Sequence, residues 1–158
     1  IFVRAVSSSS IGCLKGVIDS YVQVNRDRVG LNDGNKIATD PDAQMALAEC
    51  ISAVDECQTI MFRNFDRMVD AARSGAQLEI EERIKMRFDA ALVSRKCTEA
   101  INLMFNACGA QGIFRDHPLN RAWLDINAGR QHVANNPFKF GRNVGGVMMG
   151  NQNTDFFL

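Results

Sequence analysis

The sequence contains little histidine, proline, tryptophan or tyrosine. Only two histidines, three prolines, one tryptophan and one tyrosine occur among the 158 residues. The histidines, His117 and His132, are far apart, with no cysteine or carboxylate at zinc-like spacing around them. The Glu-x-x-His pairs that hold di-iron centres in helical bundles are absent as well. We therefore expect no resident metal.

The chain also lacks an excess of charge and a long apolar run. Its 18 basic side chains balance 18 acidic ones, so it has no basic surplus for nucleic acid or an anionic membrane. No apolar stretch approaches the ~20 residues of a membrane span, and residues 1–12 lack the order of a signal peptide. We expect a soluble, cytoplasmic protein with no membrane or nucleic-acid partner.

The cysteines are also not spaced as metal ligands. Each of the five lies on or beside an apolar stripe: Cys13, Cys50, Cys57, Cys97 and Cys108. A buried cysteine behaves as a small hydrophobic residue. We expect reduced core thiols, which agrees with a cytoplasmic setting.

Two long helices are the clearest positive signal. Apolar residues recur every three or four positions through 41–74 and again through 79–108, as on one buried helix face. Asp40 can cap the start of the first helix, and Gly75 can take the left-handed conformation that ends it. Gly109 ends the second helix.

The rest of the chain completes an all-α architecture. Two further helices are predicted, from 1 to about 28 and from 118 to about 135. Long helices joined by short loops favour an antiparallel up-and-down four-helix bundle over residues 1–137. We expect an irregular linker at 30–39 and an irregular tail at 138–158, which packs on the bundle or on a neighbouring subunit. Because helical pattern begins at once, we expect a piece of a longer protein whose upstream domains are absent.

Residues 108–137, CGAQGIFRDHPLNRAWLDINAGRQHVANNP, carry a resemblance to a known family. A glycine turn, an interval to Pro118 and a short helix resemble the end of the acyl-CoA dehydrogenase fold. In that family the turn approaches the flavin of a neighbouring subunit through its backbone, and glycine permits such an approach. The resemblance implies cofactor contacts from Gly109, Ala110, Gln111 and Gly112.

A second motif supports the same family. Asn25-Arg26-Asp27-Arg28-Val29-Gly30 lies where dehydrogenases carry Arg-x-x-Phe-Gly after their first long helix. The resemblance implies that Arg26 contacts flavin phosphate, because the planar guanidinium suits phosphate oxygens. Val29 replaces the aromatic residue of that motif. A solvated cation at a helix end is the alternative role of Arg26.

The end of the last helix separates two branches of the family. A straight-chain dehydrogenase places its catalytic glutamate, followed by Gly-Thr, where this sequence has Val133-Ala134-Asn135, and valine cannot abstract a proton. Flavin-dependent hydroxylases carry a histidine in an Asp-x-x-Ala-x-x-x-His context, which Asp125, Ala128 and His132 reproduce. The chain therefore resembles the carboxy-terminal domain of p-hydroxyphenylacetate or secosteroid-phenol hydroxylases, with His132 as catalytic residue. A dehydrogenase domain with a displaced base and a non-enzymatic oligomerisation module are the alternatives.

The hydroxylase resemblance also implies a cofactor and partners. Reduced FMN, with FAD as the alternative, would come from a separate flavin reductase, and one atom of dioxygen would enter an aromatic substrate. The oxygen chemistry belongs to the cofactor, and an imidazole beside it can stabilise negative charge. The family further implies a homotetramer. We expect the isolated fragment to be inactive, and His132 to point from the final helix toward the flavin, near the Gly109–Gly112 turn of the same or a neighbouring chain.

Overall fold

The computed structural model describes residues 2–30 and 34–158, which are mostly helical. The α-helices of the described residues are α1 (Phe2–Asn25), α2 (Pro41–Ser74), α3 (Ile80–Cys108), α4 (Pro118–Arg130) and α5 (Pro137–Met148). Short 3-10 turns, η1 (Ile37–Thr39), η2 (Gly109–Ile113) and η3 (Val133–Asn135), lie in three of the connections. Within the same residues no strand forms, and β pairing is limited to an isolated bridge between Val29 and Lys36.

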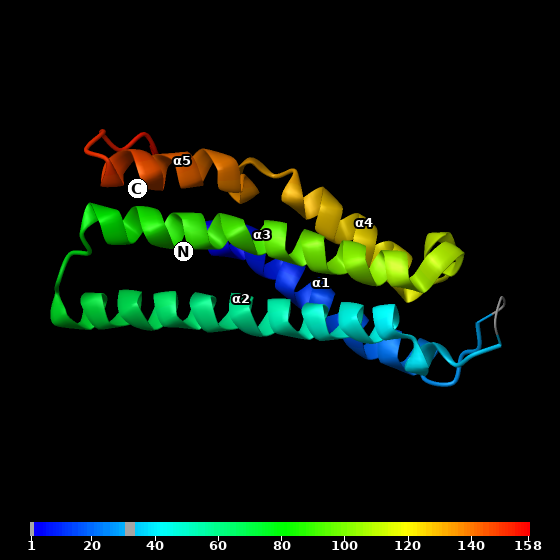
Figure 1. Cartoon of the computed structure of the whole chain (residues 1–158). Coiled ribbons are helices and arrows are strands. Elements are labelled where there is room, and N and C mark those ends of the chain that lie inside the picture. Colours follow the sequence, from blue (N-terminus) through cyan, green and yellow to red (C-terminus); the bar gives the residue numbers. More distant parts are fainter. Residues whose placement is uncertain (1, 31–33) are drawn as a thin grey trace.

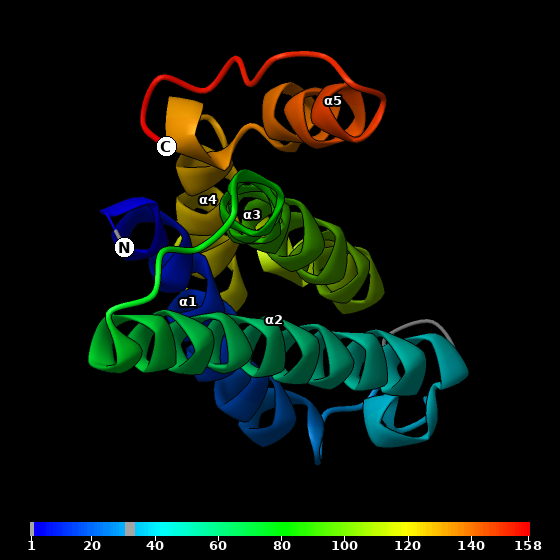
Figure 2. The same cartoon turned by 90° about the vertical axis from the view of Figure 1, so that its left-hand side faces the viewer.

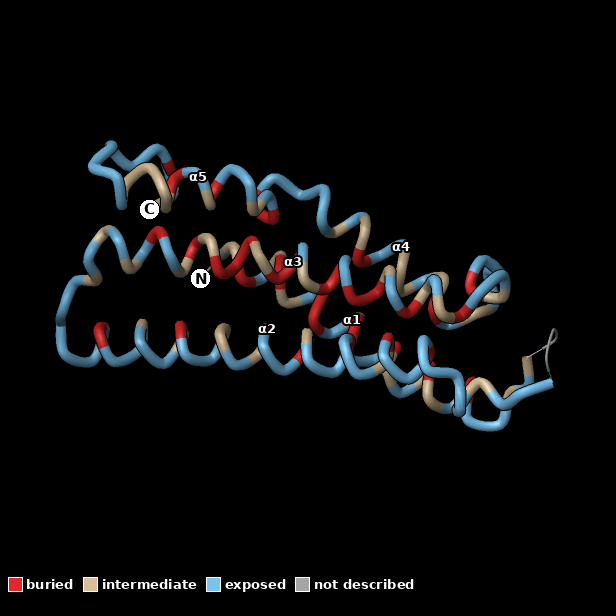
Figure 3. The backbone as a smooth tube through the Cα atoms, in the orientation of Figure 1, coloured by how far each residue is buried: buried red, intermediate tan, exposed pale blue. Residues whose placement is uncertain are grey.

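The helices α1 to α4 alternate in direction along the bundle, as Figure 1 shows. The predicted all-α antiparallel four-helix bundle is therefore confirmed. Helix α5 lies on the side of α3 that faces away from α2 (Figures 1 and 2). Buried residues gather where α1, α3 and α4 meet, whereas the outer side of α2 is exposed (Figure 3).

The two long helices begin and end close to where the sequence predicts. The Asp40 carboxylate accepts a hydrogen bond from the Ala43 amide at 2.9 Å, which satisfies one free donor at the start of α2. Gly75 follows the helix with φ 68°, a left-handed conformation that glycine adopts without strain. Local capping chemistry therefore sets both ends of α2.

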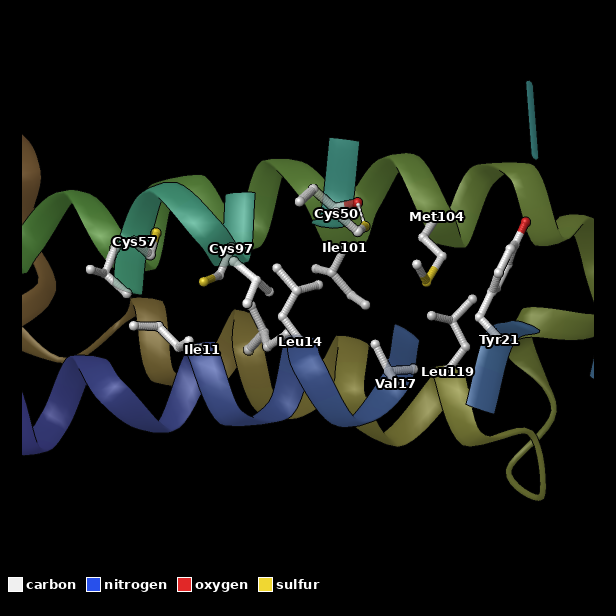
Figure 4. Close-up of a cluster of buried hydrophobic side chains, with 14 of the residues drawn as sticks. Ile11, Leu14, Val17, Tyr21, Cys50, Cys57, Cys97, Ile101, Met104 and Leu119 are labelled. Carbon is white, nitrogen blue, oxygen red and sulfur yellow. Dashed lines mark hydrogen bonds between the residues drawn. The ribbon is translucent and has the colours of Figure 1, made fainter. Parts of the chain in front are cut away.

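The core is a layer of aliphatic and thiol side chains between these helices (Figure 4). Leu14, Ile101 and Leu119 from three different helices are almost fully buried, each contributing about 1.5–3 kcal/mol. All five cysteines are free thiols, four of them buried, as predicted. The Cys50 thiol donates to the Ala100 carbonyl across the α2–α3 interface at 3.2 Å.

The carboxy-terminal end differs from the prediction. Helix α4 stops at Arg130 rather than near residue 135, and the predicted irregular tail contains helix α5. The Asn136 side chain accepts from the Lys139 amide at 3.1 Å, and Pro137 occupies the first helical position. The Asn-Pro pair therefore begins a helix, because proline needs no amide partner in the first turn.

The last residues fold back onto the bundle. The side-chain oxygen Oδ1 of Asn143 on α5 accepts from the Thr154 amide and hydroxyl at 2.8 and 2.9 Å. Asp155 then forms a buried ion pair with Arg87 of α3 at 3.3 Å. The tail therefore packs on its own bundle. Of the predicted linker, residues 31–33 lie outside the described residues, and 37–39 form the turn η1 rather than an irregular segment.

Candidate flavin-binding site

The glycine turn that follows α3 is held in one conformation. Gly109 has φ 66° and ψ −155°, a backbone region that is essentially restricted to glycine. The side-chain amide of Asn120 donates to the carbonyls of Gly112 and Ile113 at 3.2 and 3.1 Å, which fastens the turn to α4. Gly112 is buried against the Phe105 ring, whereas Gly109 and Ala110 are exposed. The turn thus presents backbone at the surface.

This turn faces the 35–41 segment across a cleft of about 530 Å³. Arg28 and Lys36 line the cleft together with the backbone of Gly109–Gln111. The Asp40 carboxylate also lines it, but it caps α2. Two cations beside exposed glycine backbone suit an anionic group such as a phosphate.

Arg28, rather than the predicted Arg26, is the arginine that reaches the glycine turn. Its Nη2 donates to the Cys108 carbonyl at 3.3 Å, and its Nη1 donates to the Asn25 side chain at 2.9 Å. Arg26 is exposed and lines a separate hollow with Ile37. The sequence signal for Arg28 was the pair of arginines after α1. Which of the two side chains points to the turn depends on the contact with Cys108, far along the chain.

His117 follows the glycine turn and caps the start of α4 as a neutral imidazole. Its Nδ1 accepts from the Leu119 amide at 3.3 Å at the start of α4, so Nε2 carries the proton. That Nε2 lies 3.5 Å from the Cys108 sulfur. Burial lowers the pKa of His117, and the nearby charge of Arg28 lowers it further. Its place before Pro118 was the sequence signal for this capping role.

His132 lies beyond the helix that the sequence assigned to it. It is the exposed N-cap of η3, and its Nδ1 accepts from the Ala134 amide at 3.1 Å. Neutral His132 therefore carries its proton on Nε2, which has no partner within residues 2–30 and 34–158. The following residues are anchored to α3, because Ser94 donates to the Asn135 carbonyl at 2.9 Å.

The predicted closeness of His132 and the glycine turn is wrong within one chain. The two lie at opposite ends of α4, whose 13 residues span about 20 Å. Asp125 forms an exposed pair with Arg121 at 2.7 Å and lies on the helix that ends before His132. An arrangement with the turn of a neighbouring chain remains a prediction.

The described side chains form neither a metal site nor a membrane span. Within residues 2–30 and 34–158, no group of three or more His, Cys, Asp or Glu residues is placed to hold a metal ion. None of the helices in this described part combines the length and apolar character that crossing a membrane requires.

Relatives of the chain carry the same domain. The chain is 29% identical to a flavin-dependent monooxygenase oxygenase subunit, HsaA, from Rhodococcus jostii, over 87% of this chain and 36% of the relative. It is 28% identical to the oxygenase component of an FADH(2)-dependent resorcinol hydroxylase from a Rhizobium species, over 92% of this chain and 37% of the relative. The chain thus spans little more than a third of these relatives.

Solved structures and a family model agree with these relatives. The crystal structure of 3-HSA hydroxylase from a Rhodococcus species superposes with a TM-score of 0.89 at 25% identity, covering 99% of this chain and 41% of that one. The predicted similarity to oxygenase components of flavin-dependent hydroxylases is confirmed. The family model described as "Acyl-CoA dehydrogenase, C-terminal domain" matches residues 5–137. The chain therefore belongs to the family of acyl-CoA dehydrogenase carboxy-terminal domains.

Proposed function

We propose that the protein containing this chain is the oxygenase component of a two-component flavin-dependent aromatic hydroxylase. The observation that carries the proposal is the similarity, over most of this chain, to oxygenase components of such enzymes. In this assignment a separate reductase supplies reduced flavin, and a phenol or related aromatic compound is the substrate. Reduced FMN is the expected cofactor and reduced FAD is the alternative. The name of the FADH(2)-dependent Rhizobium relative supports FAD. Free buried thiols agree with a cytoplasmic location.

The cleft beside the glycine turn fits the phosphate end of a flavin. Arg28 and Lys36 supply positive charge, and the backbone of Gly109, Ala110 and Gln111 is open to close approach. In the wall of the cleft, Cys108 contacts both Arg28 and His117. Arg26 lies close by in sequence and is proposed as a further phosphate contact. Bound reduced flavin would supply the activation of dioxygen.

His132 is the proposed catalytic residue of this domain. Its Nδ1 is held by the Ala134 amide, so its Nε2–H is presented as a hydrogen-bond donor in a fixed direction. Such a donor can stabilise negative charge that develops on a cofactor or substrate oxygen. Valine follows at position 133, so this segment lacks the carboxylate base of a straight-chain dehydrogenase.

The distance between His132 and the glycine turn supports assembly of the site from two chains. With the phosphate end of a flavin at the turn, His132 of the same chain cannot reach the flavin ring, because the ribityl chain that joins phosphate and ring is shorter than the about 20 Å between the ends of α4. A homotetramer, in which each site takes the turn from one subunit and the histidine from another, would bring them together. We therefore expect the isolated domain to bind flavin weakly and to be inactive.

The test compares two variants of His132 in the full-length protein, supplied with reductase, NADH and candidate phenols. His132→Ala removes the imidazole and the cap, whereas His132→Asn keeps a side-chain acceptor for the Ala134 amide. Both should lower product formation about a hundredfold or more, as expected for the loss of one well-placed donor. The neighbouring exposed Gln131→Ala is the control and should hydroxylate at the wild-type rate.

Oxygen consumption, hydroxylated product and hydrogen peroxide should be measured together. Wild-type rates and unchanged coupling of oxygen to product in both variants would show that His132 is not catalytic. The absence of oxygen-dependent product from any phenol, with oxidation of acyl thioesters instead, would overturn the hydroxylase assignment itself.

A further inference from the structure

A second pocket lies at the end of the bundle opposite the glycine turn. The pocket, of about 240 Å³, lies where the start of α1 meets α2, α3 and the last residues of the chain. Both ends of the described chain are on this side (Figures 1 and 2). Its walls are largely apolar, but Arg4, Arg83 and Arg87 also line it. It shares no residue with the flavin cleft.

The Arg4 guanidinium is buried, and its terminal nitrogens are unpaired within the part of the chain that the structure describes. Only 5% of the residue is exposed, and neither Nη1 nor Nη2 has an acceptor among the described residues. Burial lowers the pKa of Arg4, and the charge of Asp89 only partly offsets this effect. An arginine stays protonated in proteins, so a buried and unpaired guanidinium is strongly unfavourable unless an anion compensates it.

Asp89, the acidic side chain whose charge acts on Arg4, already binds other donors. The Asp89 Oδ2 accepts from Arg63, Asn64 and Lys85, each at 3.1 Å. Arg4, Arg63 and Lys85 thus set three positive charges against one negative charge. Arg87 is neutralised by Asp155, so it adds no net charge.

The rim adds to the positive charge. Arg83 is exposed at the pocket and lies next to Glu82, whose carboxylate is bound to Arg67 at 2.6 and 3.1 Å. The pocket therefore combines Arg4 and Arg83 with apolar walls that include Val3, Leu78 and Met86. The last residue, Leu158, also lines it, but the terminal nitrogens of Arg4 have no acceptor there among the described residues.

We propose that this pocket binds a small carboxylic acid with an apolar body. The carboxylate would pair with Arg4, assisted by Arg83, because the planar guanidinium matches a carboxylate through parallel hydrogen bonds. The hydrocarbon part would lie against Val3, Leu78 and Met86. The volume corresponds to roughly eight water molecules, enough for a single-ring or short branched acid. The inference does not depend on the flavin site.

Benzoate is the probe, and benzamide is its neutral control of the same shape. Isothermal titration of the full-length protein should give saturable binding of benzoate, with benzamide at least tenfold weaker. Arg4→Gln should weaken benzoate binding at least tenfold. Arg115→Gln, an exposed arginine after the glycine turn at the other end of the bundle, should leave the affinity unchanged.

Two more variants keep the test decisive if Arg4→Gln does not fold. Arg83→Gln, at an exposed position, should weaken benzoate binding several-fold, and Leu78→Trp should block it by filling the half-buried wall. Arg4→Gln, if folded, should also raise the melting temperature without ligand, because it removes an uncompensated charge. The proposal is overturned by no binding of benzoate to the wild-type protein, by equal binding of benzamide, or by wild-type affinity in the Arg4 or Arg83 variant.

Discussion

Replacing Arg87 should destabilise the domain more than replacing its ion-pair partner. Only 7% of the Arg87 side chain is exposed, and its Nε lies 3.3 Å from the Asp155 carboxylate. Its Nη1 also donates to the Ala134 carbonyl at 3.0 Å, and its guanidinium stacks 3.4 Å from the Phe140 ring centroid. One side chain therefore joins α3 to η3, α5 and the tail.

The magnitude follows from what each variant leaves behind. Arg87→Met keeps an apolar side chain of similar length but leaves the Ala134 carbonyl and Asp155 without a donor. Removing one partner of a buried ion pair costs about 3–5 kcal/mol, and we expect a loss in that range. Asp155→Asn should cost only about 1–3 kcal/mol, because the end of the chain can swing out and let water reach Arg87.

Urea unfolding followed by circular dichroism measures both losses. Arg95→Met is the matched control, because this α3 arginine is exposed and its contact with Glu99 is a surface pair at 3.8 Å. It should change the free energy of unfolding by no more than about 0.5 kcal/mol. A loss below about 1 kcal/mol for Arg87→Met, or a larger loss for Asp155→Asn than for Arg87→Met, would refute the reasoning.

Three further outcomes are expected. Gly109→Ala should cost about 1–3 kcal/mol of unfolding free energy, because a side chain strains the backbone conformation at this position. Gly12→Ala within α1 should be neutral or stabilising by up to about 1 kcal/mol. Equal effects of the two variants in urea titrations would contradict this reasoning. Leu14→Ala, at a fully buried site, should cost about 2–5 kcal/mol by the same measurement, and a loss under about 1 kcal/mol would disprove its core role. The pKa of His117 lies below its unfolded value of 6.5, so the unfolded state binds the proton more readily; this contribution to stability should be present above about pH 6.5 and lost as the pH falls through the folded pKa. His117→Asn retains a capping acceptor and should reduce the acid-side loss in melting temperature, and an unchanged pH profile would contradict this assignment.

The sequence by itself determined the long helices and the family. The bounds of α2 agree with the prediction because Asp40, Pro41 and Gly75 act on backbone within one turn of themselves. The glycine turn and the segment around His132 are contiguous motifs, so the sequence alone predicted a similarity to flavin-dependent hydroxylases, which the comparison confirms for the chain as a whole. Such signals need no knowledge of distant neighbours.

Tertiary structure alone decided the parts that depend on long-range contacts. Arg28 serves the cleft because it meets Cys108, and no local pattern distinguishes it from Arg26. The tail folds back on the bundle because Phe140 and Asp155 meet Arg87. The partnerless burial of Arg4 appears only when α1 packs beside α2 and α3. Periodicity shows which face of a helix is buried, but not which charged side chain then faces another, because that depends on residues far apart in the chain.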